Sequence, residues 1–215
     1  MICFISDLHG NSNFSGLKVY LNIAADNDLL IILGDIGLFF EDSEDNRIFN
    51  NCFLSIDKKI ALVDGNYENF SYLNSFPEEA WNGGTVRRLT ENIVLLKRGN
   101  IFNIEGKSFF VFGGCKSSPK WKEMGLWHYG EEPENEELNL AYKNLKKHNY
   151  FVDYILTHKY EQSPPRGTVC PKLRELTAFI DNNVQFKKWY AGHWHTNGKF
   201  DEKHIFIYDL LTPAD

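Results

Sequence analysis

The stretch MICFISDLHG at residues 1–10 contains a short apolar run, residues 2–6, that stops at Asp7. The same pattern returns in LLIILGD at residues 29–35 and in IALVDG at residues 60–65. Apolar runs of this length between turn residues favour strands buried on both faces, because helices so short are marginal. This part of the chain therefore predicts several buried strands, each ending at a polar loop.

Two segments between these runs are expected to be helices. Residues 17–25 and 48–55 carry apolar side chains three and four positions apart, which is typical of amphipathic helices that cross from one parallel strand to the next. The alternation of strand and helix indicates an α/β fold.

From residue 93 onward the pattern changes to strands that follow one another directly. Residues 93–96, 101–104 and 108–112 predict a β-meander or hairpin, and residues 115–137 are interpreted as a long functional loop or insertion. No linker, repeat or low-complexity segment divides the chain, so we expect a single domain over residues 1–215. The remaining predicted elements are a helix at 135–148, a strand at 154–156, a helix at 173–182 and strands at 188–190 and 205–208.

Composition and charge restrict the class of protein. The 215 residues are 43% hydrophobic and 24% charged, as in a folded globular domain. The net charge of −6 argues against an extended nucleic-acid surface. The first ten residues have neither the basic start of a signal peptide nor the length of a membrane span, so no membrane association is expected. The four cysteines form no Cys-x-x-Cys pair, which indicates reduced thiols and a cytoplasmic protein.

Polar residues follow five of the predicted strands. Loops beyond the carboxyl ends of strands in an α/β sheet converge on one crevice, so these residues can meet there. Alternate side chains of an extended segment share one side, which suits the Asp-x-His and His-x-His spacings to a common ion. Carboxylate, amide and imidazole donors match two divalent ions such as Mn, Fe or Zn. The five motifs are Asp7-Leu-His9, Gly34-Asp35, Gly65-Asn66-Tyr67-Glu68, Thr157-His158 and Gly192-His193-Trp194-His195.

Each motif alone has a simpler explanation. An isolated histidine such as His158 is more often a surface or core residue than a ligand, and Gly-Asp after a strand is more often a turn. The order of all five motifs, each directly after a predicted strand, favours the metal site.

Together these motifs resemble the calcineurin-like metallophosphoesterases, whose signature is D-x-H, G-D, G-N-H-[DE], H and G-H-x-H. The similarity runs from Asp7 to His195, and GNYENF, WNGG and FGG resemble a bacterial branch of small phosphoesterases. The resemblance implies two mixed β-sheets flanked by helices and a phosphate ester substrate hydrolysed by a hydroxide that bridges two ions, with Mn expected first. It implies that one ion is held by Asp7, His9 and His195, the other by Asn66, His158 and His193, and that Asp35 bridges both.

Tyr67 departs from the family signature, which has a histidine at this position. The resemblance implies that this residue contacts the phosphate and protonates the leaving oxygen, so Tyr67 is our candidate catalytic residue. A phenol is a weaker proton donor at neutral pH than an imidazolium, and Tyr67 as a packing residue is the alternative. Residues that could compensate are His128, Lys116, Lys159 and Arg166.

Arg166 and three tryptophans are candidates for substrate binding. Arg166 follows a Pro-Pro pair soon after His158, and its guanidinium could hold a phosphate, although a solvated loop charge is the alternative. The tryptophans Trp121, Trp127 and Trp194 could stack on a nucleobase, or they could be packing residues.

The sequence thus predicts a dinuclear metal-dependent phosphoesterase acting on a phosphodiester or a phosphomonoester, with a nucleotide as one candidate substrate. Two alternatives remain open. One is a metal- or nucleotide-binding module that has lost catalysis, because Tyr67 replaces the histidine, and the other is a nuclease subunit. The sequence leaves the oligomeric state open.

Overall fold

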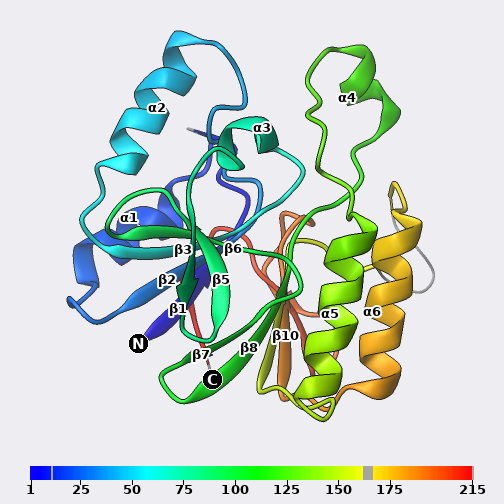
Figure 1. Cartoon of the computed structure of the whole chain (residues 1–215). Helices are drawn as coiled ribbons and strands as arrows, with labels where there is room; N and C mark the ends of the chain where they lie inside the picture. Colours follow the sequence, from blue (N-terminus) through cyan, green and yellow to red (C-terminus); the bar gives the residue numbers. More distant parts are fainter. Residues whose placement is uncertain (11, 162–166, 215) are drawn as a thin grey trace.

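The computed structural model describes residues 1–10, 12–161 and 167–214. Two mixed β-sheets pack against each other, and helices cover their outer faces (Figure 1). This is the architecture expected from the resemblance to the phosphoesterases, and it forms an α/β/β/α sandwich.

The first sheet has seven strands in the order β13-β1-β2-β3-β6-β5-β4. Its parallel centre is β1, β2, β3 and β6, while β13 and β5 run antiparallel to their neighbours. The bounds are β1 Ile2–Ile5, β2 Leu29–Leu33, β3 Lys59–Val63, β4 Glu78–Trp81, β5 Gly84–Arg88, β6 Ile93–Leu96 and β13 Thr212–Pro213.

The second sheet has six strands in the order β11-β12-β10-β9-β8-β7. Here β8, β9, β10 and β12 are parallel, and β7 and β11 close the two edges in antiparallel fashion. The bounds are β7 Ile101–Ile104, β8 Lys107–Phe112, β9 Tyr154–Thr157, β10 Lys188–Ala191, β11 Gly198–Lys199 and β12 His204–Phe206.

The core has three apolar layers, which explains why β1, β2 and β6 are apolar at every position. In β1, Ile2 and Phe4 point into the layer between the sheets, and Cys3 and Ile5 point into the layer under the helices. Because successive side chains of a strand face opposite ways, a strand buried on both faces has no polar position. The two helices that cover the first sheet are α1 (Ser15–Ile23) and α2 (Glu44–Leu54), and those that cover the second are α5 (Asn135–Lys147) and α6 (Pro171–Asn183).

The predicted strands and helices are confirmed to within a few residues at their ends, but several other features were not predicted correctly. The strand β6 pairs with β3 in the first sheet, so only β7 and β8 form the expected hairpin. The hairpin of β4 and β5 was not predicted, because its sequences EEAW and GTVRR carry charges. Residues 115–137 are largely loop but include the short helix α4 (Pro119–Glu123), and α3 (Phe70–Leu73) was not predicted.

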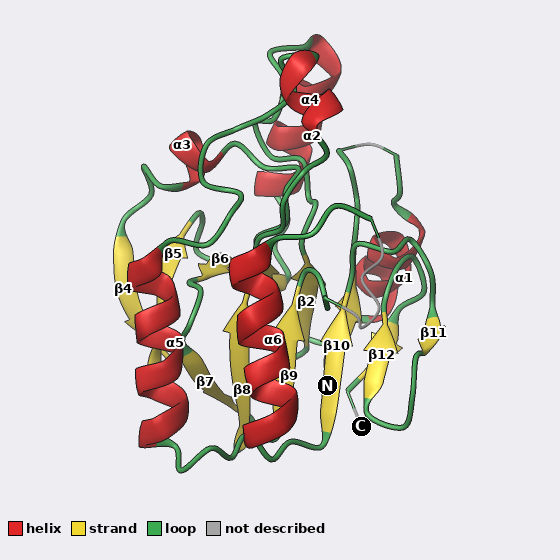
Figure 2. Cartoon of the chain, turned by 90° about the vertical axis from the view of Figure 1, so that its right-hand side faces the viewer, coloured by secondary structure: helices red, strands yellow, loops and turns green. Residues whose placement is uncertain are grey.

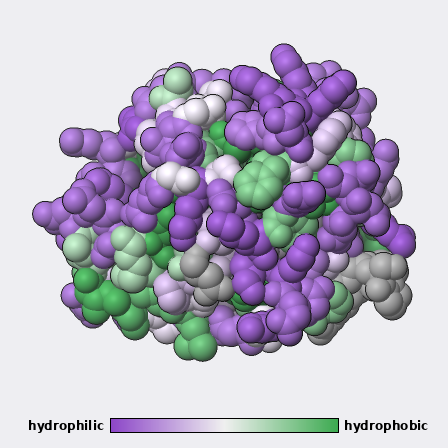
Figure 3. Space-filling model, turned by 90° about the horizontal axis from the view of Figure 1, so that it is seen from below, coloured by the Kyte–Doolittle hydropathy of each residue, from purple (hydrophilic) through white to green (hydrophobic). Residues whose placement is uncertain are grey.

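The two views place α4 above the carboxyl ends of the strands (Figures 1 and 2). The opposite end of the molecule is mainly hydrophilic, with smaller hydrophobic patches (Figure 3). Of the helices in the described part of the chain, none has the length and apolar character needed to cross a bilayer.

Candidate metal centre

The candidate ligands come from the carboxyl ends of parallel strands in both sheets. Asp7, Asp35 and Asn66 follow β1, β2 and β3, while His158 and the segment from His193 to His195 follow β9 and β10. The two sheets face each other, so these loops meet at one end of the sandwich, below α4. The fold therefore brings together residues that are far apart in the sequence.

One cluster consists of Asp7, His9 and His195, whose potential ligand atoms lie within 4.8 Å of one another. His195 Nε2 is 3.4 Å from Asp7 Oδ1 and 3.0 Å from His9 Nε2. Asp7 is fully buried, and its other oxygen, Oδ2, accepts a hydrogen bond from the backbone N–H of His193 at 2.9 Å. This contact holds the carboxylate with Oδ1 toward the two imidazoles.

The second cluster consists of Asp35, His158 and His193, also within 4.8 Å. His158 Nε2 is 3.3 Å from Asp35 Oδ1 and 3.2 Å from His193 Nδ1. The other ring nitrogen of His158, Nδ1, lies 2.8 Å from the carbonyl oxygen of Leu33. A protonated Nδ1 donates to that carbonyl and leaves Nε2 with its lone pair toward the cluster, as in many metal-binding histidines.

Asp35 lies between the two clusters and faces both. Its Oδ1 is the atom near His158, and its Oδ2 is 3.7 Å from His9 Nε2 in the first cluster. The backbone N–H groups of Asn66 and Tyr67 each donate to Oδ1 at 2.7 Å. The carboxylate is thus fixed with one oxygen toward each cluster.

Two buried oxygen atoms in the centre make no hydrogen bond to the described part of the chain, namely Asp7 Oδ1 and Asn66 Oδ1. Burying a polar atom without a partner costs free energy, and burying an unpaired charge costs more. A cation at each cluster would satisfy these oxygens, and the mixed oxygen and imidazole donors suit borderline divalent metals. The residues present therefore fit two metal ions.

The backbone at the centre differs from the sequence-based expectation. We expected the Asp-x-His and His-x-His segments to be extended, but Asp7, His9, His193 and His195 have φ angles of 58°, 45°, 69° and 47°. Asp35 also has a left-handed backbone, with φ 52°. The side chains converge because tight turns aim them at the same place, and not because alternate residues of a strand share a side.

Glycines before the ligands allow these turns to pack closely. A Cβ atom at Gly65 would collide with the carboxylate of Asp35, and one at Gly192 would collide with Ser6 Oγ. These clashes explain why glycine precedes Asn66 and His193 in the sequence.

The electrostatic environment favours neutral imidazoles at two positions. Burial lowers the pKa of His193 well below its ordinary value, and His158 lowers it further. Burial also lowers the pKa of His9, although Asp35 and Asp7 oppose this effect. A neutral imidazole has the free lone pair that a metal needs. By contrast, the close contact with the Asp7 carboxylate raises the pKa of the more exposed His195.

Tyr67 lies beside the first cluster, but its hydroxyl points to another partner. Its ring contacts His9 edge-on at 4.8 Å between centroids and stacks on Phe40 at 3.7 Å. The hydroxyl donates a hydrogen bond to Glu41 Oε1 at 3.2 Å. Burial, with a contribution from Glu41, raises the pKa of Tyr67 to about 12.

The residues named as possible substitutes for the missing histidine are engaged elsewhere. His128 Nε2 is 3.0 Å from the carbonyl oxygen of Phe40, and Lys116 pairs with Glu132 at 3.0 Å. Lys159 is fully buried and pairs with Glu161 at 3.1 Å. The remaining candidate, also predicted to bind substrate, is Arg166, which lies outside the described residues.

A cavity of about 200 Å³ opens at the candidate centre. Of the three tryptophans considered as a stacking platform or as packing residues, only Trp121 lines this cavity, so the three-ring platform is not formed there. Trp127 faces a neighbouring cavity, and Trp194 packs edge-on to His193 with 4.9 Å between the ring centroids. The lining residues are His9, Asp35, Phe40, Asn66, Tyr67, Ser117, Trp121, Leu126, His193 and His195.

Two further residues support the centre. Glu68 is fully buried, and its carboxylate accepts hydrogen bonds from the backbone N–H groups of Ile36 and Gly37 at 2.8 and 3.2 Å. Glu68 could have been identified from the sequence, because it belongs to the third motif, Gly65-Asn66-Tyr67-Glu68. Ser117 Oγ accepts a hydrogen bond from Asn66 Nδ2 at 3.1 Å, and no sequence pattern marks this residue.

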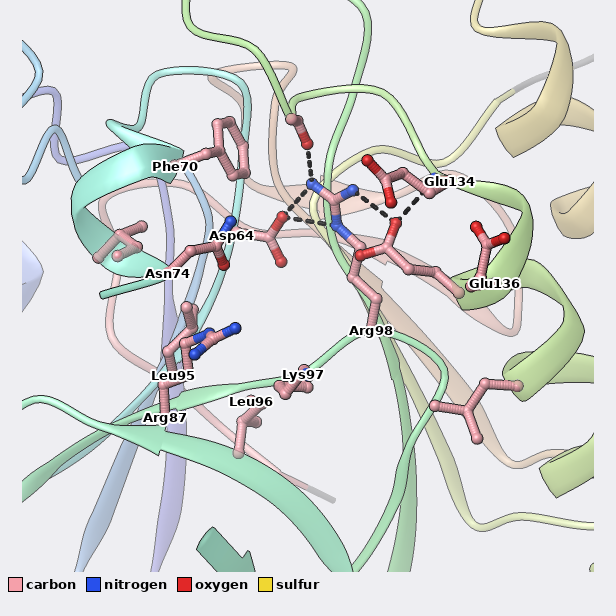
Figure 4. Close-up of a pocket in the computed structure, with 14 residues that line it drawn as sticks. Asp64, Phe70, Asn74, Arg87, Leu95, Leu96, Lys97, Arg98, Glu134 and Glu136 are labelled. Atoms are coloured by element: carbon pink, nitrogen blue, oxygen red, sulfur yellow. Dashed lines mark hydrogen bonds and ion pairs between the residues drawn. The ribbon is translucent and has the colours of Figure 1, made fainter. Parts of the chain in front are cut away.

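A buried ion pair anchors the strand end that carries Asn66. The Arg98 guanidinium binds Asp64, two residues before Asn66, and Glu137 at 3.0 Å (Figure 4). It also donates to the carbonyl oxygen of Gly130 at 2.9 Å, in the segment that includes Ser117. Arg98 therefore ties the end of β3 to the 115–137 segment, beside a separate cavity of about 340 Å³.

The α/β/β/α sandwich with two histidine and carboxylate clusters at the carboxyl ends of its strands is the architecture of a protein with a candidate metal centre. The family model described as calcineurin-like phosphoesterase matches residues 1–197. The chain belongs to this family, and its general activity is hydrolysis of phosphate esters with divalent metal ions. The comparison with curated proteins finds no match.

Proposed function

We propose that this chain is a dinuclear phosphoesterase that uses Mn, with Fe or Zn as alternatives, and acts in the cytoplasm as a single domain over residues 1–215. Asp7, His9 and His195 would hold one ion, and Asn66, His158 and His193 the other. Asp35, with one oxygen toward each cluster, is the observation that carries the proposal. The four cysteines are free thiols, which supports a location in the cytoplasm.

The side chains at this site have different proposed roles. When bound, the two ions would supply positive charge to the phosphoryl oxygens and lower the pKa of an attacking water. Asp35 would keep both in a fixed relation, because the N–H groups of Asn66 and Tyr67 hold its carboxylate. The Leu33 carbonyl would keep His158 in the tautomer that coordinates through Nε2.

We propose that Tyr67 borders the leaving group and gives it little protonation. Its hydroxyl proton is donated to Glu41, and the ring is packed on Phe40. The leaving group must then depart largely without being protonated, which favours esters of acidic alcohols such as phenols. The substrate is a phosphomonoester or a phosphodiester, and a nucleotide is one candidate.

The test combines metal analysis with hydrolysis assays. We expect about two Mn ions per chain, hydrolysis of p-nitrophenyl phosphate or its bis ester with Mn, less with Mg, and none after chelation. The Asp35→Asn variant should lose both metal and activity, while the exposed Asp57→Asn variant should keep both. Metal binding without hydrolysis of either ester would point to a binding module, and metal content unchanged by Asp35→Asn would contradict the bridging role.

A further inference from the structure

The cavity at the candidate centre has two unlike sides. One side carries the proposed ligands, among them Asp35, Asn66 and His193, and the other is formed by hydrophobic side chains. If the phosphoryl group is held by the first side, as the proposed function requires, the group esterified to it must lie along the second. The hydrophobic side consists of Phe40, Tyr67, Trp121 and Leu126.

The hydrophobic side presents ring surfaces. The ring of Tyr67 stacks on Phe40, and Trp121 meets Tyr67 edge-on with 6.5 Å between the centroids. Trp121 is 40% exposed, so part of its indole is free to contact a ligand. Aromatic surfaces of this kind bind flat rings by stacking and by edge contacts.

Two of the polar atoms on this side already have hydrogen-bond partners. The Tyr67 hydroxyl donates to Glu41, and the carbonyl oxygen of Phe40 lies 3.0 Å from His128 Nε2. Because few polar atoms remain on this side, a sugar or peptide in contact with it would lose more hydrogen bonds to water than it replaces, whereas an apolar group would lose none.

The charges beside the cavity also restrict the substrate. Within the described part of the chain, neither Lys nor Arg lines it, and Glu41 at its edge adds a negative charge. A second phosphate or carboxylate on the substrate would therefore have no ion-pair partner among the described residues of the lining, and Glu41 would repel it.

We propose that the substrate is a compact ester with a single phosphate group and a flat, apolar ester group, for which Trp121 and Leu126 determine specificity. The inference rests on the proposed function, because the metal site must hold the phosphate. It narrows the substrate class to aryl-like esters and disfavours polyphosphates.

Two phosphonates that cannot be hydrolysed test the proposal on the Mn-loaded protein by calorimetry. Phenylphosphonate should bind about tenfold more tightly than methylphosphonate, because stacking on an aromatic side chain contributes a factor of about this size. In Trp121→Ala and Leu126→Ala the preference should fall several-fold, with methylphosphonate affinity unchanged. A carboxylate in the para position of phenylphosphonate should weaken binding.

Tyr129→Ala is the matched control, because Tyr129 is 74% exposed in the same segment and does not line this cavity. It should bind both phosphonates as the wild type does. Equal affinity for the two phosphonates in the wild type, or a preference that survives in both cavity variants, overturns the inference and leaves the proposed function intact. If the Mn-loaded protein binds neither phosphonate, both proposals are wrong.

Discussion

Asn66 and Ser117 are joined by a hydrogen bond in which Asn66 Nδ2 donates to Ser117 Oγ at 3.1 Å. With Nδ2 engaged, the oxygen Oδ1 remains buried and without a hydrogen bond in the described part of the chain. The backbone N–H of Ser117 in turn donates to Glu131 Oε1 at 2.9 Å. Ser117 is thus fixed in place, and it determines which atom of the amide is available as a ligand.

Ser117→Ala should weaken metal binding at the cluster that contains His158. Loss of a hydrogen bond to a ligand typically costs about 10–100-fold in metal affinity. Metal titration should show one weakened ion and one retained, and Ser117→Thr should restore the affinity. Ser118→Ala is the control, because Ser118 begins α4 without a side-chain capping hydrogen bond. If Ser117→Ala binds both ions as tightly as the wild type does, the hydrogen bond between Asn66 and Ser117 does not affect metal affinity.

Tyr67→His should change which esters are hydrolysed. An imidazolium at this position could protonate the leaving oxygen, so kcat/KM on alkyl esters should rise about 10–100-fold more than on aryl esters. Tyr67→Phe should cost little on aryl esters, since a phenolate leaves without a proton. The ratio of alkyl to aryl kcat/KM, at full metal occupancy, checks this. An unchanged ratio in Tyr67→His would place residue 67 away from the leaving group.

The Arg98 and Asp64 pair should be strongly coupled in stability. The two side chains are 5% and 7% exposed, so Arg98→Met leaves a buried carboxylate unpaired and should lower the free energy of unfolding by about 3–5 kcal/mol. Adding Asp64→Asn should recover part of this loss, as measured in a urea double-mutant cycle. Arg47→Met is the control, because Arg47 and Glu44 are 65% and 73% exposed, and it should change little. Additive effects of the two buried changes would contradict the coupling.

His204 should make stability depend on pH. Burial lowers the pKa of His204, but hydrogen bonds to Asp181 and Asp201 outweigh that effect and raise it above the ordinary value. A raised folded-state pKa adds stability below the unfolded value of about 6.5, and this stability is lost as the pH rises through the folded pKa.

His204→Asn should therefore destabilise the protein more at pH 5.5 than at pH 8. The free energy of unfolding in urea at the two pH values measures this difference. The exposed His148→Asn should show a much smaller one. An equal loss at both pH values would mean that His204 contributes only by packing.

The sequence predicts the central strands well, because runs such as residues 29–33 are apolar at every position and suit only doubly buried strands. It does not predict the β4–β5 hairpin, whose half-exposed edge position tolerates charge. The meeting of Asp7, Asp35 and His158 is predictable from their places after strands. The contact between Asn66 and Ser117 is not, since it joins loops 51 residues apart.

The left-handed backbone at Asp7, His9, Asp35, His193 and His195 has a consequence for the evolution of this protein. Each of these side chains is held in a conformation that costs about 1 kcal/mol or more outside glycine. Glycine at the same positions would release the strain and delete the donor atom. Selection for thermal stability alone would therefore tend to replace the residues on which activity depends. Under selection for activity, the protein must instead gain stability from substitutions at other positions.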